Sequence, residues 1–180
     1  MIHFFPNIPK AIGYSESGSL IYIFTASQLF KMFVGGGSPL LLAGQPEKGF
    51  ANGQGTAAMF DWPQGVAIHP ITGMMYFTDY FNARIRTCTP LGLVGTLAGN
   101  GQHGNVDGDS SIASFRLPYG ILIDSSSTYL YVTCQQFNTL RRVVVTTGYT
   151  ITIAGQGLLG GTSTNDGQGL LAGFRDPGYV

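Results

Sequence analysis

The side chains best suited to catalysis or metal binding are scattered along the chain. His3 lies at the N-terminus, His69 follows an apolar run and His103 lies in a glycine-rich segment, so no metal-ligand spacing links the histidines. The run Gly13–Ser17 imitates a nucleophile elbow only in part, because its closing glycine is missing and no acid and base partners are evident. We therefore expect that the protein is not an enzyme and that it has no catalytic residue, no metal ligand and no cofactor.

One pair of carboxylates offers a second kind of chemistry. Asp107 and Asp109 flank Gly108, and carboxylate oxygens are ligands that calcium prefers. Two carboxylates next to a turn are more commonly solvated, so we interpret them as turn residues and keep calcium binding as the alternative.

The composition excludes several classes of protein. Of the 180 residues, 44% are hydrophobic and 10% are charged, which is typical of a globular chain and not of a disordered one. Nine basic and nine acidic side chains cancel, which excludes the broad basic surface that nucleic-acid binding needs. A surface with so little net charge favours association between chains.

No segment has the features of a targeting signal or a membrane span. The N-terminal residues lack a basic region and contain Pro6 and Pro9, so we see no signal peptide. The most apolar stretch, 20–34, is interrupted by Gln28 and Lys31 and is too short to cross a bilayer. Few lysines and many Thr, Ser, Tyr and Gly residues favour an extracellular or cell-surface location, although no Asn-x-Ser/Thr acceptor is present.

The strongest pattern is an internal repeat of about 55 residues. Its first anchor is a Leu-Ala-Gly triplet, followed by an Asn-Gly or Asp-Gly pair, by Ala-x-Phe and by a proline three residues later. The triplets begin at Leu42, Leu97 and Ile153, the pairs at Asn52, Asp107 and Asp166, the phenylalanines are Phe60, Phe115 and Phe174, and the prolines are Pro63, Pro118 and Pro177.

Each repeat predicts four strands. Apolar runs at 65–68 and 120–123 follow the proline, and β-rich segments at 75–78 and 130–133 come next. A third strand begins near Ile85 or Leu140, and a fourth ends in the Leu-Ala-Gly anchor. Four-stranded antiparallel units of this length are typical of β-propeller blades. We therefore predict an all-β chain, a single segment 1–180 with blades at about 9–44, 63–99 and 118–155 and the start of a fourth at 174–180.

The motifs resemble those of the NHL repeat family. Its units combine Phe-x-x-Pro-x-Gly-Val with Asp-x-x-Asn-x-Arg-Ile, present here from Phe60 to Val66 and from Asp79 to Ile85. The third unit departs from the pattern, with Cys134 and Thr139 in place of the acidic and basic residues. The resemblance implies a propeller. Some NHL propellers are metal-dependent lyases that need histidines converging on the central channel. This sequence does not supply such histidines. The lyase alternative is therefore a fragment of a larger enzyme whose catalytic residues lie in other blades.

Most repeated residues are expected to have structural roles. Gly65 and Gly120 should lie where neighbouring sheets approach closely near the axis, and the Pro-x-Gly strands should be the most buried segments. Asp79 and Arg84 should form an ion pair across a turn. The three repeated phenylalanines should fill the space between blades.

Aromatic and amide side chains are predicted to gather on one loop face. The loop between the fourth and first strands opens on the same face as the turn between strands two and three. Such side chains suit contact with a protein or sugar, because they bury a large area at low entropic cost. The alternative is that they merely cover the core. The candidate interaction face contains Trp62, Tyr80, Phe81, His103, Gln135, Gln136 and Phe137.

The two cysteines are expected to be reduced. Cys88 falls on the third strand of one unit and Cys134 at the end of the second strand of the next. Packed sheets lie about 10 Å apart, whereas bridged cysteines need Cα atoms within about 7 Å.

Three units and the first strand of another do not close a propeller, since closed rings have about four to eight blades. We expect a non-catalytic scaffold for protein–protein contact that assembles with copies of itself, as a ring completed in trans or as a head-to-tail filament. The segment 178–180 should then pair with, or lead into, residues 1–5 of a neighbour. The alternatives are a truncated piece of a longer chain and a carbohydrate- or peptide-binding module that uses the aromatic face.

Overall fold

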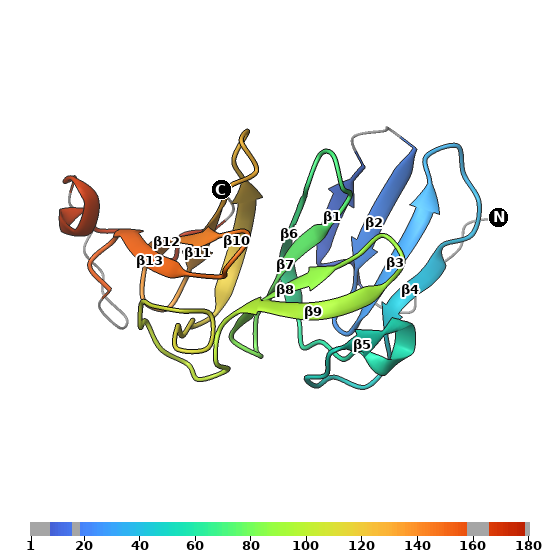
Figure 1. The fold of residues 1–180 in the computed structure, drawn as a ribbon, viewed down its shortest axis with the longest axis horizontal. Coiled ribbons are helices and arrows are strands. Elements are labelled where there is room, and N and C mark those ends of the chain that lie inside the picture. The colour runs from blue at the N-terminus through green and yellow to red at the C-terminus, as the bar shows by residue number, and fades with distance from the viewer. Residues whose placement is uncertain (1–7, 16–18, 158–165, 179–180) are drawn as a thin grey trace.

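The computed structural model describes residues 8–15, 19–157 and 166–178, which form three antiparallel sheets (Figure 1). The first sheet contains β1 (Ala11–Tyr14), β2 (Leu20–Phe24), β3 (Gln28–Phe33) and β4 (Leu40–Gly44). The second contains β6 (Pro63–Ile68), β7 (Met75–Asp79), β8 (Arg84–Cys88) and β9 (Leu93–Ala98), with the short β5 (Gly53–Gln54) paired to β9. The third contains β10 (Pro118–Ile123), β11 (Tyr129–Cys134), β12 (Thr139–Val144) and β13 (Thr150–Ala154).

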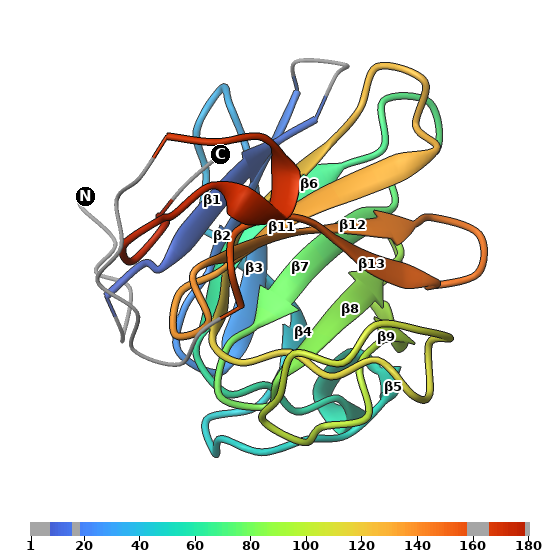
Figure 2. The same cartoon turned by 90° about the vertical axis from the view of Figure 1, so that its left-hand side faces the viewer.

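Each sheet is a meander in which consecutive strands pair, and we call the three sheets blades 1, 2 and 3. The blades follow one another along the chain and do not close into a ring (Figures 1 and 2). The all-β class and the three four-stranded units predicted from the sequence are confirmed. Two short 3-10 helices, η1 (Gly55–Ala57) and η2 (Gly169–Leu171), occupy the loops that follow the Leu-Ala-Gly and Ile-Ala-Gly anchors.

The first strands of blades 2 and 3 begin with the same irregularity. The pairing register shifts between Pro63 and Val66 and between Pro118 and Ile121, where a proline without an N–H can be accommodated. The residue before each proline has a positive φ, which is 61° for Trp62 and 51° for Leu117. The repeat therefore imposes a left-handed backbone at Trp62 whatever side chain stands there.

An apolar core fills the space between each pair of neighbouring blades. In the first core, the Phe77 ring lies 4.8 Å from that of Phe24 and 5.2 Å from that of Phe60. Phe115 occupies the matching position in the second core and, like Phe60, is fully buried. The predicted role of these phenylalanines between blades is confirmed, while Phe174 is half-buried.

The first strands β1, β6 and β10 lie side by side (Figure 1). A Cβ added to Gly65 would lie 2.6 Å from the carbonyl oxygen of Tyr119, so the close approach predicted at Gly65 is confirmed. The expectation that these strands are the most buried is wrong. All five residues of β7 are buried, whereas β6 and β10 each contain half-exposed residues, because β7 is flanked by strands on both sides and the first strands lie at the edges of their sheets.

The prediction of an ion pair between Asp79 and Arg84 is also wrong. Asp79 instead pairs with Arg86, whose Nη1 lies 2.6 Å from Asp79 Oδ2, and both side chains are fully buried. Arg84 lies opposite Asp79 in the β7–β8 register, but its guanidinium lies over the Phe50 ring and donates to the carbonyl of Asn82. Arg86 adds hydrogen bonds to carbonyls of the preceding loop, which secures that loop to blade 2.

Blade 3 contains the same buried arginine with its carboxylate in a different place. Arg141 matches Arg86, but Cys134 replaces Asp79, and the acid comes from the loop as Asp107, 2.7 Å from Arg141 Nη2. Asp107 also accepts hydrogen bonds from the backbone and side chain of Thr152. Both of its oxygens are thus engaged within the fold, which argues against the calcium alternative.

Cys88 and Cys134 are free, as predicted, and both are buried. The described segments include no helix with the length and hydropathy needed to cross a bilayer. The predicted pairing of 178–180 with 1–5 falls outside the described residues except for Gly178, whose carbonyl accepts a hydrogen bond from Thr133 of the same chain.

Candidate functional site

Four aromatic rings form a continuous row on the loop face of blades 2 and 3, and we call Trp62, Phe81, Tyr80 and Tyr119 the aromatic row. Trp62 and Phe81 have ring centroids 6.1 Å apart, and those of Phe81 and Tyr80 are 4.9 Å apart. Tyr80 and Tyr119 follow at 6.1 Å. The planes are steeply inclined at every step, which is the favourable edge-to-face geometry.

The row is positioned by the loops that join the strands. Trp62 is the last residue of the loop before β6, and its backbone N–H donates a hydrogen bond to the carbonyl of Ala26 in blade 1. Phe81 lies in the β7–β8 turn, and its N–H donates to the carbonyl of Asp61. These bonds join the loop before β6 to blade 1 and to the β7–β8 turn.

Exposure differs along the row. Phe81 is 47% exposed, while Trp62, Tyr80 and Tyr119 are half-buried. Burial, together with the neighbouring Tyr119 and Asp176, raises the pKa of the Tyr80 phenol. The phenol therefore stays neutral, and it donates a hydrogen bond of 3.1 Å to Gln135 Oε1 in the next blade.

Two lysines lie over the single tryptophan. Lys10 Nζ is 4.1 Å and Lys48 Nζ is 4.3 Å from the centre of the Trp62 ring. Such cation–π contacts are favourable, more so when they are shielded from water. Lys48 also lies 3.8 Å from Asp61. The Trp62 end of the row is thus positively charged.

The structure brings together only part of the predicted interaction face. Trp62, Tyr80, Phe81 and Gln135 meet in the row and its hydrogen bond. Gln136 is half-buried and accepts a hydrogen bond from the Arg116 side chain, which lies in the preceding loop.

His103 and Phe137 take other places. His103 is exposed and forms a backbone bridge with Phe115 in the long loop. Phe137 is half-buried in the β11–β12 turn. Sequence reasoning missed Tyr119, Lys10 and Lys48. Tyr119 and Lys10 follow the repeat prolines Pro118 and Pro9, so the repeat itself carried the signal for two of the three.

Two side chains weighed for catalysis from the sequence, His69 and Ser15, form hydrogen bonds with the backbone of neighbouring residues. His69 Nδ1 accepts hydrogen bonds from the N–H groups of Ile71 and Thr72 and so caps the β6–β7 turn. Ser15 Oγ accepts from the N–H of Leu20. Within the described residues, no three His, Cys, Asp or Glu side chains are grouped closely enough to hold a metal ion.

Comparisons with known proteins identify the fold. No protein-family model and no curated protein matches the chain. A protein of unknown function from Bacteroides thetaiotaomicron is similar over 96% of this chain and 42% of its own, with a TM-score of 0.77 and 22% identity. A structure of a nidogen/laminin complex matches over 88% and 52%, with a TM-score of 0.65 and 15% identity. Virginiamycin B lyase from Staphylococcus aureus, solved with quinupristin, matches over 83% and 43%, with a TM-score of 0.56 and 16% identity.

These likenesses establish the fold alone. The neighbours include β-propellers of the NHL-like kind, so the chain consists of propeller blades. It spans between 42% and 52% of the length of these three structures.

Proposed function

We propose that the chain is an NHL-type propeller scaffold that contacts other protein chains through the aromatic row. The observation that supports this role most directly is the row itself, four inclined rings with a half-exposed Phe81 and two lysines over Trp62. Tryptophan, tyrosine and arginine dominate the binding energy of protein interfaces, since large rigid rings bury much area at little entropic cost. The nidogen/laminin neighbour supports the use of such blades in protein contact.

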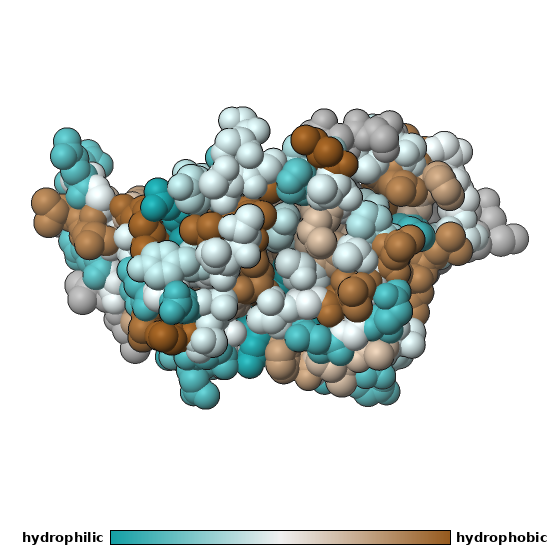
Figure 3. Space-filling view, in the orientation of Figure 1, coloured by the Kyte–Doolittle hydropathy of each residue, from teal (hydrophilic) through white to brown (hydrophobic). Residues whose placement is uncertain are grey.

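We further propose that copies of this chain are among its partners. The chain carries no net charge, so long-range repulsion between copies is weak. Blade 1 also exposes apolar side chains to solvent (Figure 3), with Leu40 53% and Leu41 42% exposed. Exposed apolar patches of this kind are typical of association surfaces, and an extracellular or cell-surface setting suits such an assembly.

Trp62 gives a direct test of the site. It is the single tryptophan, so quenching of its fluorescence by acrylamide reports the accessibility of the row. If the row forms the contact, quenching should decrease as the protein concentration rises through the range in which the chain associates. Association that leaves Trp62 equally accessible would exclude the row as the contact.

A carbohydrate- or peptide-binding role is the second candidate. Tyr80 and Gln135 place a hydrogen-bonding pair beside exposed Phe81, and sugars commonly bind where polar groups adjoin aromatic faces. A glycan array probed with the purified chain separates this role from the first. Saturable binding to one glycan class, abolished by Phe81→Ala, would favour it.

A further inference from the structure

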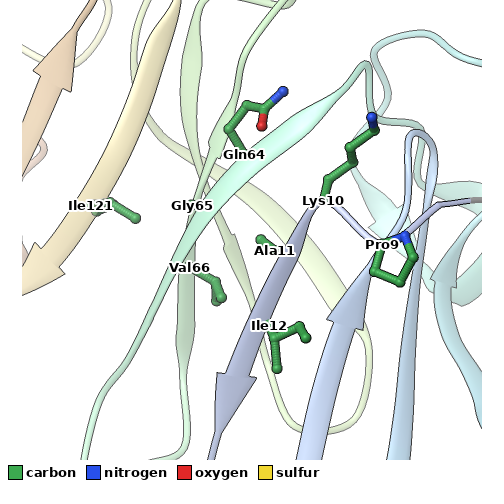
Figure 4. Close-up of a pocket in the computed structure, with 8 residues that line it drawn as sticks. All are labelled: Pro9, Lys10, Ala11, Ile12, Gln64, Gly65, Val66 and Ile121. Atoms are coloured by element: carbon green, nitrogen blue, oxygen red, sulfur yellow. The ribbon is translucent and has the colours of Figure 1, made fainter. Parts of the chain in front are cut away.

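The first strands enclose a pocket beside the aromatic row. Its volume is about 350 Å³, and it is lined by β1, β6, one residue of β10 and the two residues before β1 (Figure 4). Its walls are aliphatic, contributed by Ile12, Val66 and Ile121 among others. Two polar side chains, Lys10 and Gln64, lie toward the same end of the pocket, above Val66 and Ile12 in the view of Figure 4.

Lys10 and Gln64 occupy the same position in the repeat. Each follows the repeat proline and precedes a small residue, in Pro9-Lys10-Ala11 and Pro63-Gln64-Gly65, and the third unit has Tyr119 there. The position after the repeat proline thus carries an ammonium in blade 1, an amide in blade 2 and a phenol in blade 3. Because the fold accepts three different side chains at this position, their chemistry is available for binding.

Gln64 is buried without a partner. The residue is only 8% exposed, and within the described residues its amide makes no hydrogen bond. The amide atoms are not themselves fully buried, so the N–H₂ group is accessible to a ligand that enters the pocket. Lys10 is half-buried and likewise has no carboxylate within ion-pair distance among the described residues. The pocket therefore offers an ammonium and an amide N–H₂ above aliphatic walls.

We propose that this pocket binds a carboxylate carried on a short aliphatic body. The ammonium of Lys10 and the amide of Gln64 are donors that match the two oxygens of a carboxylate. The walls suit a body of a few carbon atoms, and the lining contains no acidic residue that would repel the anion. The group can come from a free carboxylic acid or from the C-terminal end of a peptide. This site does not depend on the scaffold role.

Trp62 fluorescence provides the readout, because Lys10 lies over its ring. Butyrate should change the emission of the full chain saturably, and its isostere butyramide should bind at least about tenfold more weakly, since hydrogen bonds to charged groups are worth about that factor or more. Hexanoate should bind more tightly than butyrate because it fills more of the aliphatic walls. Calorimetry repeats each titration without the optical probe.

Lys48 supplies the matched control, since it lies over the same ring but does not line the pocket. Lys10→Met should weaken butyrate binding about tenfold, and Lys48→Met should leave it within about twofold. If Lys10→Met fails to fold by circular dichroism, Gln64→Leu decides, because it removes a side chain that makes no hydrogen bond in the described fold. Gln64→Leu should weaken butyrate binding several-fold.

Peptides separate the two sources of the carboxylate. An N-acetylated Gly-Val with a free C-terminus that binds more tightly than butyrate, and loses binding on amidation, identifies a peptide end. Butyrate binding more tightly than the peptide identifies a small acid. Absence of saturable butyrate binding, equal affinity for butyramide, or equal losses in Lys10→Met and Lys48→Met would overturn the proposal.

Discussion

The hydroxyl of Thr78 in blade 2 donates a hydrogen bond of 2.7 Å to the carbonyl oxygen of Tyr119 in blade 3. The Thr78 hydroxyl oxygen in turn accepts a hydrogen bond of 2.9 Å from the backbone N–H of Gly65, so one side chain joins three strands. Thr133 repeats the arrangement one blade later, between the N–H of Gly120 and the carbonyl of Gly178. The relay connects successive blades where their first strands meet.

Removing this hydroxyl should destabilise the contact between blades. Thr78→Val leaves a buried N–H and a carbonyl without their partner, which should lower the free energy of unfolding by about 1–3 kcal/mol. Thr78→Ser keeps the hydroxyl and should recover part of the loss. Urea denaturation measures both. Thr87→Val on β8 is the control and should change stability by less than about 0.5 kcal/mol, because Thr87 is half-exposed. Equal losses at the two positions would refute the relay.

The buried pair of Arg86 and Asp79 should be far more sensitive than Arg84. Asp79→Asn leaves the fully buried guanidinium uncompensated, which should cost about 3–5 kcal/mol. Asp107→Asn should cost less, because the Asp107 side chain is 44% exposed and water can replace part of the interaction. Arg84→Gln should cost less than about 1 kcal/mol. Thermal unfolding of the three variants gives the order, and a larger loss for Arg84→Gln than for Asp79→Asn would restore the pairing predicted from the sequence.

Gly65 should not tolerate a side chain. A Cβ there would meet the backbone of β10, with Tyr119 O at 2.6 Å and Ile121 N at 3.1 Å. Both atoms belong to a strand paired with β11, and Tyr119 O also accepts the Thr78 hydroxyl, so they cannot move freely and Gly65→Ala should cost more than about 2 kcal/mol. Gly35→Ala is the matched control, since no atom lies within 4 Å of its added Cβ. A stable Gly65→Ala variant, measured by its melting temperature, would mean that β6 and β10 are farther apart than described.

Cys88 should make the fold sensitive to alkali. Burial raises the pKa of its thiol from 9.0 to about 12. Between these values the unfolded chain loses the proton and the folded chain keeps it, so stability is complete below pH 9 and falls as the pH rises toward 12. The slope for one thiol is at most about 1.4 kcal/mol per pH unit. Under reducing conditions, the free energy of unfolding should therefore decrease more steeply with pH in the wild type than in Cys88→Ser. Parallel curves would contradict the assignment.

The repeat anchors predicted the strands well, because each anchor has a local cause. Gly99 illustrates this: its φ is 105° and an added Cβ would lie 2.8 Å from the carbonyl of Ala83, so only glycine fits after the fourth strand. The Asp79 partner could not be predicted in the same way. Arg84 and Arg86 are both compatible with the β7–β8 register, and only the loop carbonyls that receive Arg86 decide between them.

The candidate site was predicted in outline and not in composition. Trp62, Phe81 and Tyr80 follow from the shared loop face, but His103 lies in a long loop whose course the repeat does not determine. Lys10 comes from a different blade, and its position over Trp62 depends on how blades 1 and 2 pack.

Molar mass in solution tests the central claim most directly. Light scattering on the 19.2 kDa chain should give a mass that increases with concentration in the micromolar range. Phe81→Ser should reduce the association, whereas Ile71→Ser, which removes an apolar side chain that is 89% exposed in the β6–β7 turn, should not. A folded monomer at all concentrations, or equal effects of the two substitutions, would contradict a scaffold that assembles through the aromatic row.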